Sequence, residues 1–146
     1  MASITKLPNN NLEMPHFYNI SGTVGLNQRN LRQDVALVQY LLKNRDPFPT
    51  NGLAFVNLDI EDPQGIFGKE TAARLKDYLT KIAKSGNFVN LNSFECFVRV
   101  SHAAAISNPQ HSPFLLMHLN ASTYIHNPKA FAFENVKRSI LTLTEE

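Results

Sequence analysis

The sequence predicts an α+β fold that is mainly α, with a three-helix core and a C-terminal strand and helix extension packed on it. Two segments carry apolar residues at helical spacing, and residues 94–100 alternate as a half-buried strand does. All six glycines lie between Gly22 and Gly86. This shift in composition predicts an N-terminal arm (1–18), a helical core (19–86) and an aromatic-rich extension (87–146) within the same globular unit.

Composition narrows the class of protein. A length of 146 residues corresponds to about one domain, and a 43% hydrophobic content excludes a disordered chain. The net charge is +2 without a block of like charges, so we expect no nucleic-acid partner. No stretch approaches the roughly 18 apolar residues of a membrane span, and no secretory signal is recognisable. We therefore expect a cytoplasmic protein, with export to the envelope by a non-classical route as the alternative.

The arm contains Pro8 and Pro15, which oppose helix, and ends in an aromatic segment over 16–20 that could tie it to the body. The first helix is predicted over 31–44. Asn30 is its expected N-cap, and Gln33 is the expected capping-box partner. An apolar stripe predicts its buried face: Val35, Val38, Leu41 and Leu42.

A connector over 49–63 fits either a short helix or an extended chain, and a turn follows over 62–65. The second helix is predicted over 69–84, with Gly86 as its C-cap. Acid-before-base pairs, Glu70 with Arg74 and Asp77 with Lys81, indicate its solvated face. Its expected buried stripe consists of Ala72, Leu75, Tyr78, Leu79 and Ile82.

The last sixty residues are less regular. The apolar run over 114–119 fits a helix or a buried strand. Asn127 and Pro128 are a typical N-cap and first residue of a helix, which we expect to reach about residue 138. Alternation over 140–144 predicts a short closing strand.

Two segments together resemble a known family. Residues 34–42 read Asp-Val-Ala-Leu-Val-Gln-Tyr-Leu-Leu, and residues 65–71 read Gly-Ile-Phe-Gly-Lys-Glu-Thr. The stretch over about 20–84 is similar to the small helical peptidoglycan-binding domains found beside bacterial cell-wall hydrolases, where an Asp-Val-x-x-Val-Gln-x-Leu-Leu helix precedes an Asp-Gly-x-Phe-Gly-x-x-Thr turn. Gln64 stands where that family has Asp, and Leu79 replaces its Gln. The resemblance implies a peptidoglycan-binding-like core in which Phe67 is a central apolar plug.

No catalytic set is recognisable. Cys96 lies in the predicted strand, where a free cysteine is typically an inert hydrophobe. The acidic residues Asp59, Glu61 and Asp62 are interpreted as a solvated connector. The histidines lack metal-ligand spacing: His102, His111, His118 and His126. We expect no metal, no cofactor and no enzymatic activity, with lytic activity as the remaining alternative.

Two classes of function remain for a chain without a recognisable catalytic set. The first is a non-catalytic cell-wall-binding module whose ligand-binding residues, chosen by position, are Asn30, Arg32, Gln64, Arg74 and Tyr78. The second is a protein-interaction or adaptor module on the same fold, associated with a secretion system or a phage. Its candidate partner surface consists of Phe114, Leu115, Leu116, Met117 and Tyr124, for which packing in the core is the competing interpretation. The oligomeric state stays open.

Overall fold

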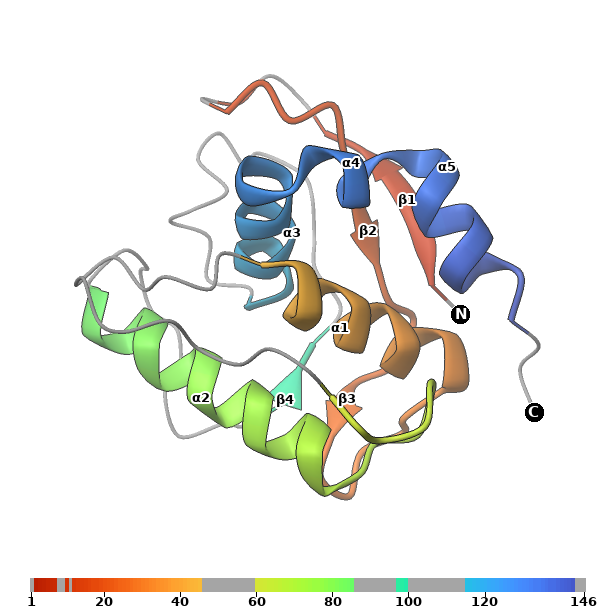
Figure 1. Ribbon diagram of the computed structural model, residues 1–146, viewed down its shortest axis with the longest axis vertical. Coiled ribbons are helices and arrows are strands. Elements are labelled where there is room, and N and C mark those ends of the chain that lie inside the picture. The colour runs from red at the N-terminus through yellow and green to blue at the C-terminus, as the bar shows by residue number, and fades with distance from the viewer. Residues whose placement is uncertain are drawn as a thin grey trace.

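The computed structural model describes residues 2–7, 10, 12–45, 60–85, 97–99 and 115–143 (Figure 1). Within these ranges the fold is α+β and mainly helical, as the sequence predicts. No helix in the described part is long and apolar enough to cross a membrane. Several predictions lie outside the described residues: the connector up to residue 59, the Gly86 cap, and the strand positions at 94–96 and 100.

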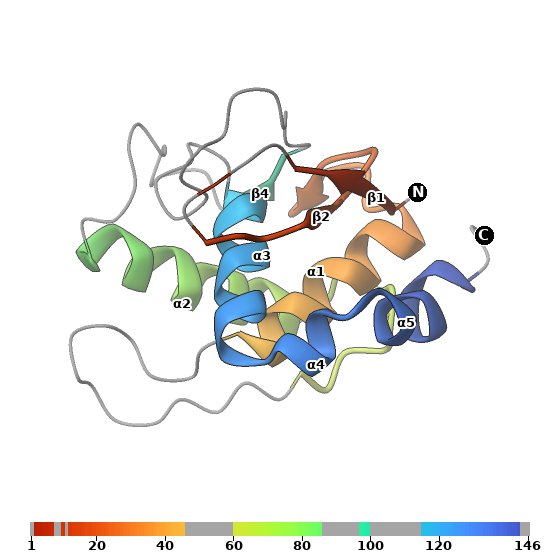
Figure 2. The same ribbon diagram turned by 90° about the horizontal axis from the view of Figure 1, so that it is seen from above.

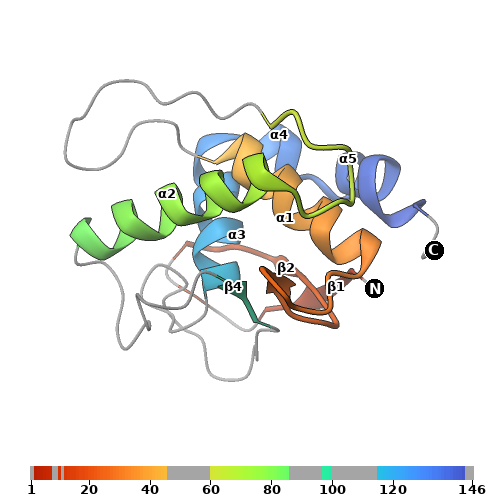
Figure 3. The same cartoon turned by 90° about the horizontal axis from the view of Figure 1, so that it is seen from below.

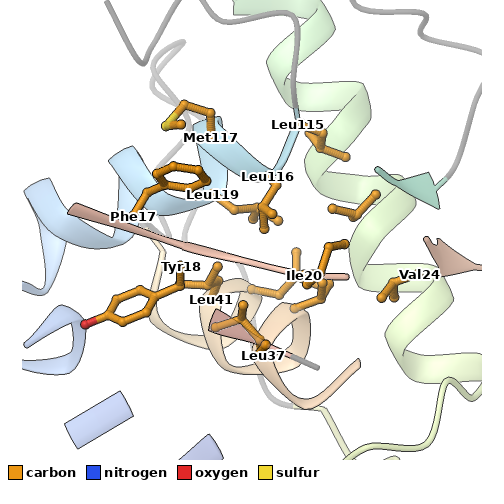
Figure 4. Packing of buried hydrophobic residues seen from close by; sticks show 14 of the residues in the cluster. Phe17, Tyr18, Ile20, Val24, Leu37, Leu41, Leu115, Leu116, Met117 and Leu119 are labelled. Atoms are coloured by element: carbon orange, nitrogen blue, oxygen red, sulfur yellow. The ribbon is translucent and has the colours of Figure 1, made fainter. Parts of the chain in front are cut away.

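The N-terminal arm forms a β-hairpin. Strand β1 (Ser3–Lys6) pairs antiparallel with β2 (His16–Asn19), with Ile4 opposite Tyr18. Phe17 and Tyr18 are fully buried in the core (Figure 4), which confirms that the aromatic end of the arm ties it to the body.

Asn120 attaches this hairpin to the helices. It lies on α3 (Leu115–His126), and its Oδ1 accepts from the Tyr18 N–H at 2.7 Å. Its Nδ2 donates to the Tyr18 carbonyl at 3.0 Å and to the Leu116 carbonyl at 2.9 Å. A neighbouring strand would satisfy the same two main-chain groups of Tyr18. The buried amide therefore takes the place of a third strand.

Helix α1 (Arg32–Asn44) is the central helix and packs against α2, α3 and the C-terminal helices (Figures 2 and 3). The predicted stripe is buried throughout. Leu37 and Gln39 are buried as well, because neighbours cover α1 on several sides. Helix α2 (Lys69–Ser85) buries Leu75, Tyr78 and Leu79, as predicted.

The predicted cap of α1 is wrong. The N-cap residue is Leu31, which makes no side-chain capping bond. Asn30 has a φ of 50°, a conformation that Asn tolerates well, and its amide instead bonds the N–H and the carbonyl of Gly25, both at 2.8 Å. Gln33 is no capping-box partner either, because its amide donates to the Leu143 carbonyl at 2.6 Å.

The second strand pair joins β3 (Val24–Gly25) to β4 (Phe97–Val98). Val98 is fully buried, in agreement with the expected strand at these two residues. Helix α3 resolves the ambiguous apolar run in favour of a helix.

The C-terminal helix is interrupted. Asn127 caps α4 (Pro128–Phe131) by accepting from the Ala130 N–H at 3.2 Å, as predicted. Ala132 then adopts an extended conformation, and α5 (Phe133–Val136) and the π-helix η2 (Lys137–Leu141) follow. The closing strand predicted over 140–144 is wrong in its described part, because Ile140 and Leu141 belong to η2 and Val136 and Ile140 are both buried at a helical spacing. Residue 144 lies outside the described residues.

Two tyrosines fix α4 against the core. The hydroxyl of Tyr18 donates to the Phe131 carbonyl at 2.5 Å, and that of Tyr40 donates to the Ala130 carbonyl at 2.6 Å. Burial raises the pKa of both tyrosines above the ordinary value, so both hydroxyls stay protonated donors.

We predict that Asn120→Ala lowers the free energy of unfolding by about 2–4 kcal/mol, because the Tyr18 main chain is left buried without partners. Urea denaturation measures the change. Asn135→Ala is the control, since Asn135 makes one exposed bond, to the Lys129 carbonyl. Equal losses in the two variants would contradict the role given to Asn120.

Candidate functional site

The candidate site is built around the turn that precedes α2. The turn is closed by a hydrogen bond from the Ile66 N–H to the Pro63 carbonyl at 3.0 Å. Asp62 starts it, and its Oδ2 accepts from the Thr71 N–H at 2.6 Å and from the Thr71 hydroxyl at 2.7 Å. The carboxylate therefore caps the N-terminus of α2.

This cap corrects the interpretation of the acidic connector as merely solvated. Burial opposes ionisation of Asp62, but hydrogen bonds from the Thr71 hydroxyl and from the N–H groups of Thr71, Glu70 and Gly68 outweigh it. They hold the pKa of the Asp62 carboxyl below its ordinary value. Glu61 is exposed, and Asp59 lies outside the described residues.

Two glycines give the turn its shape. Gly65 has a φ of 85°, a backbone conformation that residues other than glycine rarely adopt. It also lies directly against Arg32. Gly68 lies against the carboxylate of Asp62, and a Cβ at this position would overlap its oxygens. The cap on α2 thus requires a glycine at position 68.

Gln39 joins this turn to α1. Its Oε1 accepts from the Gly65 N–H at 2.9 Å, and its Nε2 donates to the Ile66 carbonyl and to the Thr71 hydroxyl, both at 3.0 Å. The Thr71 hydroxyl in turn donates a hydrogen bond to Oδ2 of Asp62. One buried amide therefore connects α1, the turn and α2.

Asp34, the acidic residue that opens the helical motif, holds the chain before β3. It accepts from the Gly22 N–H at 2.9 Å and from the Ser21 N–H at 3.2 Å. Its carboxylate is fully buried. The motif residues Asp34, Gln39 and Thr71 are thus all committed to contacts inside the protein.

The five predicted ligand-binding residues do not form one free surface. Arg32 lies against Gly65, beside the exposed Gln64, so the structure brings these two together. Asn30 is bonded to Gly25, and the amide of Gln64 donates to the Ser139 carbonyl at 3.0 Å.

The other two lie farther along α2. Arg74 pairs with Glu70 at 3.6 Å, the predicted intrahelical pair. Tyr78 is only 6% exposed, and the guanidinium of Arg45 covers its ring at 4.7 Å from the centroid. Asp77 contacts Arg45 at 3.7 Å. Tyr78 is therefore packed beneath Arg45, and its role in ligand binding stays a prediction.

The residues of the predicted partner surface that the structure describes are mostly packed in the core, in line with the competing interpretation. Leu115, Leu116 and Met117 are buried (Figure 4), because α1 and β2 pack on α3. Tyr124 is half-buried, with its ring 5.3 Å from that of Phe131 in an edge contact. Phe114 lies outside the described residues.

Sequence reasoning missed Ile66, which is 55% exposed at the tip of the turn. It also missed the role of Gln39, although a polar residue inside an apolar helical stripe is a signal of a buried hydrogen bond. Phe67, the expected plug, packs against the core but is only half-buried.

The described residues offer little conventional chemistry. They contain no group of three or more side chains that could hold a metal ion. His118 is buried, His126 is exposed, and Asp62 is committed to capping α2. Cys96, His102 and His111 lie outside the described ranges.

Comparison with known proteins adds no family. No family model matches the chain, and no curated protein or solved structure is significantly similar to it. The resemblance over 20–84 therefore stays a prediction from the sequence.

We predict that Gln39→Met lowers the free energy of unfolding by about 2–4 kcal/mol, because the Gly65 N–H and the Thr71 hydroxyl lose a buried partner while the side-chain volume is kept. Chemical denaturation tests this. Gln28→Met is the control, since Gln28 is exposed and bonds the Leu26 carbonyl at 3.4 Å. A loss no larger than that of the control would refute the joining role of Gln39.

We predict that Asp62→Asn lowers the free energy of unfolding near neutral pH. The difference in this free energy between the variant and the wild type should shrink in acid. The pKa of Asp62 is lower in the folded protein than in the unfolded chain, where it is 3.8. The contribution of Asp62 to the free energy of unfolding is therefore fully present above pH 3.8 and is lost as the pH falls through the pKa of the folded state. Unfolding free energies at about pH 6 and about pH 3 measure the difference, in which the other carboxyl groups largely cancel. A difference independent of pH would show that Asp62 does not cap α2 as a carboxylate.

Proposed function

We propose that the chain is a non-catalytic module that binds peptidoglycan, and that its binding face consists of the first turn of α1 and the turn over 63–66. One observation supports this above the others. Gln39 of the helical motif bonds Gly65 and Thr71 of the turn motif, so the two segments that resemble the peptidoglycan-binding family form a single unit.

The chemistry of this face suits a wall stem peptide, which carries carboxylates, amides and methyl groups. Arg32 supplies a cation, Gln64 an amide and Ile66 an exposed apolar side chain, all beside Gly65. The hydrogen bonds of Gln39 hold the main chain of the turn, so little conformational entropy is lost on binding. A rigid turn with these groups supports recognition of a peptide more than catalysis.

A wall binder has to reach the wall. The proposed route is non-classical, through a secretion system or by phage lysis. No metal or cofactor enters the proposal.

The second candidate, a protein-interaction module, is favoured by Leu26. Its side chain is 72% exposed in the turn before α1. This turn is stiff, because the Gln28 N–H donates to the Gly25 carbonyl and the Asn30 amide bonds Gly25 twice. A rigidly held apolar side chain suits a protein interface. Loss of a co-purifying partner from the native host in a Leu26→Ser variant would support this candidate.

We predict that the protein co-sediments with purified insoluble peptidoglycan at low salt and that Ile66→Asp weakens this binding at least tenfold, the effect of losing one buried apolar anchor. Ile125→Asp is the matched control, because Ile125 is 52% exposed on α3, away from the proposed face. Wild-type protein left in the supernatant, or equal losses in the two variants, would refute the proposal.

A further inference from the structure

The C-terminal segment lies on the proposed binding face through its main chain. The Gln64 amide donates to the Ser139 carbonyl at 3.0 Å. The Gln33 amide donates to the Leu143 carbonyl at 2.6 Å and to the Leu141 carbonyl at 3.4 Å. Gln33 follows Arg32 and Gln64 precedes Gly65, so both donors belong to the face proposed above.

These contacts have the form of peptide recognition. Side-chain amides of the face donate, and main-chain carbonyls of the segment accept, so the contacts do not depend on which side chains the segment carries. Leu143 lies beyond η2, and an extended peptide would offer a main-chain carbonyl like its own. The Oε1 atom of Gln33, a residue only 3% exposed, has no hydrogen-bond partner in the described part of the chain. A bound peptide N–H could occupy it.

The end of the segment is held less firmly than the helix before it. Ile140 is fully buried, but Leu141 and Leu143 are half-buried and Thr142 is exposed. Leu141 is the last residue of η2, so only residues 142–143 can leave the face while Ile140 stays in the core and η2 stays folded. Their release removes the shorter of the two bonds of the Gln33 amide, the one to the Leu143 carbonyl.

We propose that residues 142–143 are a strap that occupies the Gln33 amide through the Leu143 carbonyl and competes with a wall stem peptide for it. This inference rests on the proposed peptidoglycan binding. The strap lowers the apparent affinity by the fraction of molecules in which it is closed.

The test compares the full chain with a chain that ends at Leu141. Peptidoglycan co-sedimentation is expected to be about tenfold tighter for the shortened chain, the factor implied by release of one hydrogen bond of ordinary strength, that of Gln33 to Leu143. Shortening also removes two acidic residues, so the control is the full-length Glu145→Gln/Glu146→Gln variant, which has the same side-chain charge and keeps the strap. This control is expected to bind like the wild type.

A second readout keeps the strap separate from wall binding. In 15N NMR spectra of the full chain, the Gln33 side-chain amide should be protected from exchange, and shortening should remove that protection. A synthetic peptide of residues 137–146 added to the shortened chain should restore it and lower the binding to peptidoglycan. If circular dichroism shows that the shortened chain does not fold, full-length Leu143→Asp replaces it, with the same expected gain.

Each outcome decides between the claims. Equal or weaker binding by the shortened chain, with binding by the wild type retained, overturns the strap and leaves wall binding standing. Absence of binding by both chains, with Gln33 protection still lost on shortening, overturns wall binding and reduces the contact to a cap on η2.

Discussion

The side-chain amide of Gln39 is the interaction on which the rest of the molecule depends. It satisfies the main chain of the turn before α2 and positions the Thr71 hydroxyl, which in turn bonds the carboxylate of Asp62. Each of these groups is polar and buried or half-buried, so removing the amide would leave several of them without partners. Together with the apolar packing of Leu75 and Leu79, this residue fixes the turn before α2 against α1.

Other neutral side-chain amides also hold main-chain groups in place. Asn120 takes the place of a strand beside Tyr18, and Asn30 closes the turn at Gly25. Gln33 and Gln64 hold the carbonyls of the C-terminal segment. Only 18% of the residues are charged, and these contacts show how neutral side chains position the elements instead. A neutral amide can donate and accept at once, which suits a main chain that presents both groups.

The sequence predicts the helices well and the contacts between them poorly. The stripes of α1 and α2 are visible because burial repeats with the helical period, as at Leu41 and Leu75. The bond between Gln39 and Thr71 spans 32 positions, so no local pattern reveals it. The position of Tyr78 on α2 makes it a ligand candidate, but the ring is covered by Arg45, the residue that directly follows α1. Of the candidate site, only the pairing of Arg32 with the turn at Gln64 was predictable, through the motif that brings the turn to α1.

The most direct measurement is a 15N NMR titration of the full chain with soluble peptidoglycan fragments. The account predicts saturable shifts in the N–H groups of Arg32, Gly65 and Ile66 and in the side-chain amides of Gln33 and Gln64. Signals of the β1–β2 hairpin should stay in place. Absence of shifts at high fragment concentration, or shifts confined to the hairpin and α3, would contradict the proposed binding face.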